Sequence, residues 1–320
     1  MVGGRVGSRR GNRLAPRVAG CWALVLAGVG ALVSCSASDS PLGSDEASTP
    51  VLRIPVVVHI VHNGEPVGSG ANLSDQRVAD QIRVLNEDYR RKTGTPGFNS
   101  DPAGADARME FVLAVRDPDG APTSGIRRVD ASTTENPFPG HDVFAHYGHY
   151  GFWDPERYVN VWTMPLPPSA ESIVLGFTTG PDSDLPGMEF LIGAEPGKPE
   201  GILVNAAHFG PSELLSPFNR GRTLTHEMGH YFGLLHLWGG GDCRGDDFVG
   251  DTPPVATPVT TCAPLEGCSG EPTQSHNYMT FAPDSCMNLF TEGQVERMRY
   301  VLRRSPRRRS LPTSPALPGG

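Results

Sequence analysis

The sequence lacks a long apolar run, an internal repeat and an excess of positive charge. The apolar stretch from Val18 to Val33 is short and glycine-rich, which argues against a membrane-spanning helix. The formal net charge is -8 at pH 7, and no basic patch indicates nucleic-acid binding. Charged residues make up only 19% of the 320 residues, whereas 39 glycines and 31 prolines predict long ordered loops. This length allows one or two domains with a substantial core.

Acidic residues are absent before Cys35, where the basic residues are Arg5, Arg9, Arg10, Arg13 and Arg17. A basic segment followed by an apolar one is typical of a signal peptide, which we expect to span residues 1–34. Residues 32–35, Leu-Val-Ser-Cys, resemble a bacterial lipobox, and this predicts cleavage before Cys35 and lipidation of its thiol. Ordinary secretion with cleavage near Ala37 is the alternative. Residues 35–50 are rich in Ser, Asp and Pro, and we expect them to form a tether.

One segment carries the pattern HExxHxxGxxH. His226 and His230 are four residues apart, so on a helix they lie on one face and can bind one metal ion. Glu227 is rotated by about 100° from His226, which places its carboxylate beside such a metal rather than on it. Gly233 tolerates a positive φ, so the helix can end there and the chain can turn to deliver His236 as a third ligand.

Three neutral ligands leave zinc with its full charge and one open position, where the pKa of a bound water falls to about 7. HExxH alone occurs by chance on ordinary helices, but the added glycine and third histidine make chance improbable. Closed structural zinc sites usually use cysteine ligands and a fourth protein ligand. The pattern therefore favours a catalytic zinc site with Glu227 as its base.

Apolar periodicity predicts several strands before the metal-binding helix and little regular structure after it. Strands are expected within residues 51–61, 109–115, 126–129, 158–164, 174–177 and 202–205. Helices are expected from Ser74 to about Arg91, from about Asn219 to Leu234, and after a capping box that begins at Thr291.

The order of these elements predicts an upper lobe, residues 51–233, and a lower lobe, residues 234–304. The lobes would meet at Gly233, with the metal in the cleft between them. Residues 305–320 are rich in Arg and Pro, and this composition predicts a disordered tail.

Four cysteines follow Cys35, and they are Cys243, Cys262, Cys268 and Cys286. In an exported chain they predict two disulfides, for which three pairings are possible. Acidic and turn residues gather at 245–253, where the candidate calcium ligands are Asp246, Asp247, Asp251 and Thr252. A solvated acidic loop is an equal alternative there.

Further motifs resemble the pappalysin family of metzincin metallopeptidases. Residues 276–281, His-Asn-Tyr-Met-Thr-Phe, look like the Met-turn, and the Gly-Asp-x-x-x-x-Asp-Thr-Pro sequence at 245–253 is similar to that of the family. Other matching segments are 54–59, 84–89, 284–287 and 290–299. The resemblance covers about residues 51–304 and is strongest to the ulilysin and cytophagalysin members.

The resemblance implies an α/β (α+β) fold with a mixed, twisted five-stranded sheet above the active-site cleft. It implies zinc ligation by His226, His230 and His236. Glu227 would then be the general base and acid, and Met279 the Met-turn residue. The resemblance also implies calcium near residues 246–252 and the disulfide pairs Cys243–Cys268 and Cys262–Cys286.

This chain departs from the family pattern at one position of the cleft. Family members commonly have a tyrosine two residues after the Met-turn methionine, and here the residue is Phe281. His149, Tyr150 and Tyr278 are the candidates for a replacement donor. Residues 36–50 are too few for a folded prodomain and contain no Cys-switch sequence, which puts latency through a propeptide in doubt.

Together these features predict an exported zinc metalloendopeptidase that hydrolyses protein or peptide substrates. We expect a monomer, either lipid-anchored on the outer side of the bacterial cytoplasmic membrane or secreted, with membrane contact only through the lipid. The alternative is a surface-anchored binding or adhesion lipoprotein with a non-catalytic zinc site. Glu227 distinguishes the two, because a binding module needs no base beside its metal.

Overall fold

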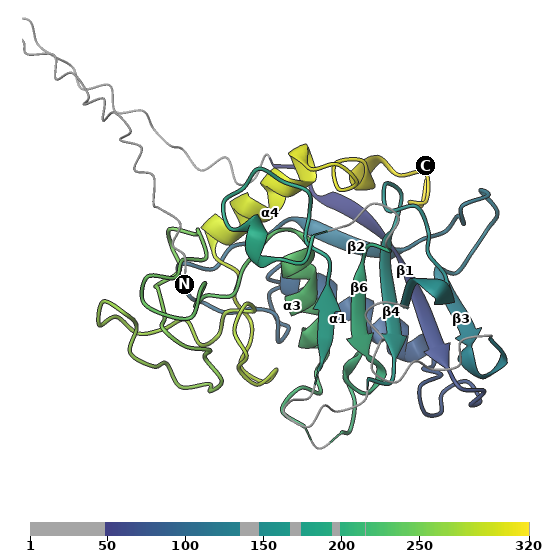
Figure 1. Cartoon of the computed structure of the whole chain (residues 1–320), viewed down its shortest axis with the longest axis horizontal. Helices are drawn as coiled ribbons and strands as arrows, with labels where there is room; N and C mark the ends of the chain where they lie inside the picture. The colour runs from purple at the N-terminus through teal and green to yellow at the C-terminus, as the bar shows by residue number, and fades with distance from the viewer. Residues whose placement is uncertain (1–48, 135–146, 167–173, 194–198, 215, 320) are drawn as a thin grey trace, which may run out of the picture. The chain divides into compact units, whose positions relative to one another are not determined.

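The structure is a computed structural model that describes residues 49–134, 147–166, 174–193, 199–214 and 216–319. Residues 48–320 form one compact unit (Figure 1). The expected signal peptide, with Cys35 and nearly all of the tether, lies outside the described residues. Within the described ranges, no helix is both long and apolar enough to cross a membrane.

A mixed sheet forms the centre of this unit. Its strands are β1 (Leu52–His62), β2 (Met109–Leu113), β3 (Ile126–Asp130), β4 (Val159–Met164), β5 (Gly176–Thr178) and β6 (Ile202–Asn205). The order across the sheet is β2-β1-β4-β6-β5, and only β5 runs antiparallel to its neighbour. Strand β3 pairs with the second half of β1, beyond β2. The expected mixed sheet is thus confirmed, with six strands in five positions.

Strand β1 is central because its β-branched run is buried on both faces, from Ile54 to His62. Such a run is typical of a strand covered on both sides in a parallel sheet. Strand β4 is buried at every position as well. The core cluster joins these strands to the helices described next.

Helix α1 (Asp75–Tyr89) packs against helix α3 (Arg222–Tyr231), which carries the predicted ligands His226 and His230. Ser74 caps α1 through the N–H of Arg77, as the sequence predicts. At the other end of α1, the buried Asp88 accepts a hydrogen bond from the Thr225 hydroxyl at 2.7 Å and from the Arg222 guanidinium at 3.2 Å. These bonds tie the strand-and-helix half of the chain to the first turn of α3.

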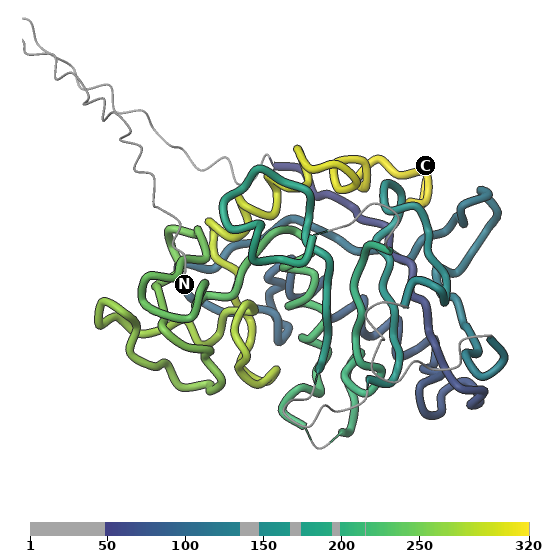
Figure 2. The backbone as a smooth tube through the Cα atoms, in the orientation of Figure 1, coloured from purple at the N-terminus to yellow at the C-terminus, as the bar shows by residue number. Residues whose placement is uncertain are grey.

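Helix α4 (Glu292–Arg304) closes the unit, and its predicted capping box is present at Thr291 and Gln294. Figure 2 shows that long loops fill most of the chain between α3 and α4. Short 3-10 helices complete the structure: η2 (Ala131–Thr133), η3 (Tyr147–Tyr150), η4 (Met188–Phe190), η5 (Ala206–His208) and η6 (Leu311–Thr313).

The prediction of a disordered tail at 305–320 is wrong for the described part of that segment. Helix η6 packs against β1, and Leu311 and Ala316 are fully buried. The Ala316 carbonyl accepts a hydrogen bond from the N–H of Val115 at 3.0 Å. The amino-acid composition gave the wrong prediction for this segment, because a few apolar residues among many Arg and Pro are enough to pack a short segment against an existing core.

Candidate active site

Helix α3 is buried along its whole length and carries the first two histidines of the pattern. It begins after Gly221, whose φ of +84° is left-handed, and its last helical residue is Tyr231. The expected limits, Asn219 and Leu234, therefore lie outside the helix by three residues at each end. The left-handed glycine at Gly221 sets the start, and the turn at Gly233 sets the end.

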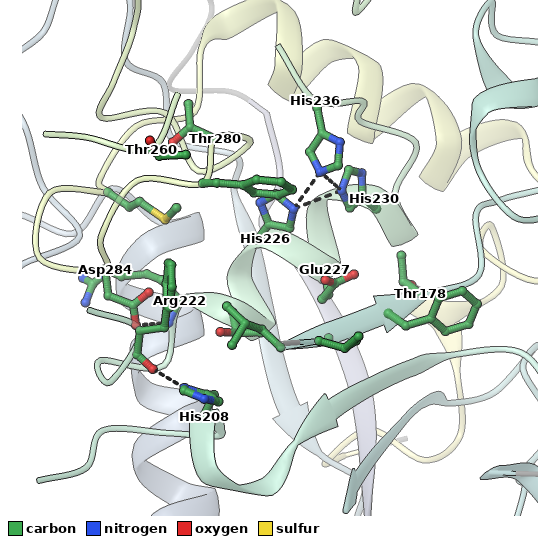
Figure 3. Close-up of a pocket in the computed structure, with 18 of the residues that line it drawn as sticks. Thr178, His208, Arg222, His226, Glu227, His230, His236, Thr260, Thr280 and Asp284 are labelled. Carbon is green, nitrogen blue, oxygen red and sulfur yellow. Dashed lines mark hydrogen bonds between the residues drawn. The ribbon is translucent and has the colours of Figure 1, made fainter. Parts of the chain in front are cut away.

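The three predicted ligand histidines come together at the end of α3 (Figure 3). Their Nε2 atoms form a triangle with edges of 3.0 to 3.1 Å. Nδ1 of His226 donates to the carbonyl of Tyr278 at 2.7 Å, and Nδ1 of His230 donates to that of Leu234 at 2.8 Å. These two bonds fix the tautomers of His226 and His230, so the Nε2 atoms of these two rings present lone pairs to the centre of the triangle.

Two Nε2 lone pairs that face each other at this distance repel, because no proton lies between them. A cation bound by all three Nε2 atoms would remove this repulsion. Zinc–nitrogen bonds of about 2.0–2.1 Å suit a triangle of this size. Burial lowers the pKa of His226 to about 4 and that of His230 to about 3, which keeps both rings neutral as ligands must be. The residues therefore fit a zinc ion. Among the described residues, this is the one group of three or more His, Cys, Asp or Glu side chains able to hold a metal.

The predicted turn at Gly233 is present, with φ at +88°. The N–H of Gly233 bonds to the His230 carbonyl at 2.8 Å, and the N–H of Leu234 bonds to the Gly229 carbonyl at 3.0 Å. This closure reverses the chain and brings His236 over the helix, where its ring stacks on Trp238 with centroids 4.3 Å apart.

Met279 lies directly against the metal-binding helix, as expected for a Met-turn. A Cβ placed on Gly229 would be only 2.6 Å from Met279 Sδ, so a larger residue at that helical position would force the Met279 side chain to move. Met279 is fully buried, and its N–H is held by the Asn277 side chain at 2.9 Å. The adjacent Tyr278 carbonyl is the one that orients His226.

Glu227 faces the same cavity as the histidines but is not part of their triangle (Figure 3). Strand β5 passes so close that a Cβ on Gly176 would lie 2.8 Å from Glu227 Cγ. Burial raises the pKa of the Glu227 carboxyl to about 8. A cation held by the three imidazoles acts in the opposite direction, because it stabilises the carboxylate.

A cavity of about 1140 Å³ opens beside the histidines and is lined from both sides of Gly233. Strand β5 and Phe190 to Ile192 form one wall, and the segment from Thr280 to Met287 forms another. Arg222, His208 and Asp284 lie at the end away from the histidines (Figure 3). Most of the remaining lining is apolar, which suits peptide side chains.

Phe281 stands at the mouth of this cavity, 41% exposed. The three alternative donors do not line the cavity. Tyr278 is fully buried and packs on Phe290, and Tyr150 belongs to a separate apolar cluster with Trp162. The phenol missing at Phe281 is therefore not replaced by any of them.

Both predicted disulfides are present in the region below the cavity. Cys243 pairs with Cys268 and Cys262 pairs with Cys286, with Cα atoms 5.5 and 5.6 Å apart. The Cys286 carbonyl is bonded to Nδ1 of His276 at 2.7 Å, and His276 begins the Met-turn segment. The Cys262–Cys286 disulfide therefore links the loop that carries Cys262 to the Met-turn segment.

The acidic loop does not gather its carboxylates at one point. Asp247 is buried and accepts hydrogen bonds from the Thr252 hydroxyl, while Asp251 accepts from the Thr291 hydroxyl at 2.7 Å and the Gly293 N–H at 2.9 Å. Asp246 accepts from the N–H of Phe248. Asp251 thus links the loop to the start of α4, a role that spacing in the sequence did not indicate.

Comparisons with known proteins agree with this geometry. A family model described as peptidase M43, pregnancy-associated plasma protein-A, matches residues 142–303. The chain is 28% identical over 254 residues to extracellular metalloprotease 1 of Coccidioides posadasii, which covers 79% of this chain and 77% of that protein. It is 30% identical over 261 residues to an extracellular metalloprotease of Pyricularia oryzae, with 80% and 77% covered.

Among solved structures, mature mirolysin of Tannerella forsythia in complex with a cleaved peptide matches with a TM-score of 0.68 and 35% identity, over 82% of this chain and 96% of that chain. A promirolysin mutant of the same organism matches with a TM-score of 0.69 and 34% identity, over 83% and 85%. The chain therefore belongs to the pappalysin family, peptidase M43, and is a metalloendopeptidase.

Proposed function

We propose that this chain is an exported zinc endopeptidase whose zinc is held by His226, His230 and His236. The single observation that carries the proposal is the triangle of Nε2 atoms, 3.0 to 3.1 Å on each edge, beside a buried carboxylate that does not join it. Zinc bound there would polarise the scissile carbonyl and lower the pKa of a water molecule.

Glu227 is the proton carrier in this proposal. It is the acidic side chain beside the histidines in the cavity, and it would take a proton from the attacking water. The same carboxyl would then give that proton to the leaving amine, so that the residue returns to its starting state. Its burial keeps competing water away from the proton during this transfer.

Strand β5 offers a place for the substrate backbone. It is the last strand in the sheet order, and its residues line the cavity next to Glu227. A peptide in extended form can add to an exposed strand edge through main-chain hydrogen bonds. We propose that the substrate lies along β5, between the upper lobe, 51–233, and the lower lobe, 234–304.

Removing and restoring the metal tests the proposed function. We expect a chelator to abolish the cleavage of casein or of a peptide, and one equivalent of zinc to restore it. Peptide cleavage that survives complete removal of the metal would contradict the proposal. A chain that binds zinc but cleaves no protein or peptide would support the alternative, a binding lipoprotein.

Finer proposals concern the membrane and calcium. The curated relatives are named extracellular, which supports export. We propose that the lipobox-like residues 32–35 direct the attachment of a lipid to the Cys35 thiol. We also propose that the protein is a monomer. Calcium near Asp246, Asp247, Asp251 and Thr252 also stays a proposal. A rise in melting temperature on adding calcium to the zinc-loaded protein would support it, and an unchanged melting temperature would oppose it.

A further inference from the structure

The turn that joins the second and third zinc ligands is held by side chains from outside it. Between His230 and His236 the helix has ended, so its last carbonyls lack the usual helical partners. The Gly233 carbonyl accepts a hydrogen bond from Arg297 Nε of α4 at 2.7 Å. The Tyr231 carbonyl accepts one from Arg308 Nε at 3.2 Å.

Arg308 belongs to the C-terminal segment that follows α4 and is fully buried there. Its guanidinium carbon lies 3.5 Å from the centre of the Tyr231 ring, so the side chain covers the residue whose carbonyl it contacts. The guanidinium also pairs with the carboxylate of Glu200, which is 1% exposed and lies two residues before β6. Arg307 pairs with the other oxygen of Glu200 at 3.0 Å. Arg308 is thus fixed between the sheet and the end of α3.

The contact point lies next to a proposed ligand. Tyr231 directly follows His230 in the chain, and the turn after it delivers His236. A cation at a helix C-terminus also offsets the negative end of the helix dipole. Position 308 lies beyond residues 142–303, where the family model matches, so the motif comparison gives no role to it.

We propose that Arg308 is a positioning residue for the zinc site. It holds the end of α3 so that His230 and His236 keep the spacing that one zinc ion requires. This inference rests on the proposed zinc site. It extends that site to a segment that the sequence predicted to be a disordered tail.

Zinc affinity is the direct test, because a residue that only adds stability would leave affinity unchanged in the folded protein. We expect Arg308→Ala to weaken zinc binding by about 10-fold, near the lower end of the effects of outer-shell changes. We expect kcat to fall with little change in KM. Affinity is measured by competition with a chromogenic chelator, at a temperature where circular dichroism shows both proteins folded.

The matched control is Arg309→Ala, because Arg309 is the exposed neighbour of Arg308. It should bind zinc as the wild type does. Arg308→Lys keeps a positive charge but lacks the rigid planar fork whose separate nitrogens reach the Tyr231 carbonyl and Glu200, so we expect an intermediate affinity. This conservative variant also provides a folded protein if the alanine variant does not fold.

A double variant separates positioning from stability. Glu200→Leu with Arg308→Met replaces the buried ion pair with apolar side chains of similar volume, and such replacements are often neutral or stabilising. We expect a melting temperature close to that of the wild type but weakened zinc binding. Wild-type zinc affinity in folded Arg308→Ala, or in the double variant, would overturn the proposal. Because the readout is affinity, this result is distinct from a failure of the chain to cleave peptides.

Discussion

Phe281 places its ring at the mouth of the cavity, with ring centroids 4.9 Å from His236 and 4.8 Å from Trp238. A tyrosine there could donate a hydrogen bond to an oxyanion near the histidines, whereas phenylalanine has no donor. A single missing oxyanion donor costs about 2.7–4 kcal/mol in the barrier. The expected cost here is smaller, because zinc would carry most of the stabilisation.

Phe281→Tyr should therefore raise kcat and leave KM nearly unchanged, since the new bond would form mainly in the transition state. Both parameters are measured on one peptide substrate, with zinc content checked. Phe248→Tyr is a suitable control, because Phe248 is similarly exposed, at 39%, but does not line the cavity. An unchanged or lower kcat for Phe281→Tyr would show that this enzyme does not lack a phenolic donor.

Spacing predicted the identity of the site residues, but it did not predict what orients them. The histidines and Glu227 follow from helix periodicity and one glycine. The acceptors for Nδ1 of His226 and His230 are main-chain carbonyls of Tyr278 and Leu234, which any residue type could supply. A sequence pattern cannot carry that information, because the side chain at the acceptor position is irrelevant to the bond.

At the scale of elements, the Cys262–Cys286 disulfide holds the Met-turn segment, and the Met-turn segment packs against α3. Cys286 is nearly buried in the main core, and its carbonyl holds His276 at the start of the Met-turn segment. The other disulfide, Cys243–Cys268, joins more exposed parts of the loop. The two bridges close loops of similar length, so they form a matched pair for comparison.

Replacing either pair of cysteines by serine should lower the free energy of unfolding by about 2–4 kcal/mol. Only the loss of Cys262–Cys286 should also weaken zinc binding, because only this bridge holds the segment that carries Tyr278 and Met279. Denaturant unfolding and zinc competition measure the two effects. Equal zinc affinities for the two double variants would show that the Met-turn keeps its position without the bridge.

The C-terminal segment shows where prediction from composition failed. Its arginines suggested a solvated tail, yet Arg308 finds Glu200 and Tyr231, which are distant in sequence. No local pattern links these residues. By contrast, the strands and the starts of α1 and α4 were predicted well, because apolar periodicity and capping residues act locally.

At the scale of the whole molecule, residues 48–320 form one unit, and its described residues line a cavity beside the proposed metal site. The sheet, α1 and the C-terminal segment all contact α3 or its ends. The fold class was predictable because motifs of the family are spread over most of the unit. The pairing of β2 with the first half of β1 and of β3 with its second half could not be predicted, since register depends on contacts across the sheet.

The proposed attachment to a membrane would depend on the segment before this unit. Cys35→Ser removes the thiol that the lipobox-like residues would present for lipidation. We expect the variant to leave the membrane fraction or to accumulate unprocessed, and cell fractionation with immunoblotting measures both. Ala37→Ser provides a control, because position 37 matters only for ordinary secretion. Membrane association that is unaffected by Cys35→Ser would contradict the lipid anchor.

Glu227→Ala tests the central claim most directly, because the claim assigns zinc to the histidines and the proton transfers to the glutamate. Zinc content and peptide cleavage are measured on the same purified samples, with Glu296→Ala as the exposed glutamate control. We predict that Glu227→Ala keeps about one zinc per chain and loses at least about 10²–10⁴-fold in kcat, while the control matches the wild type. Undiminished cleavage, or loss of the zinc together with the activity, would contradict this assignment.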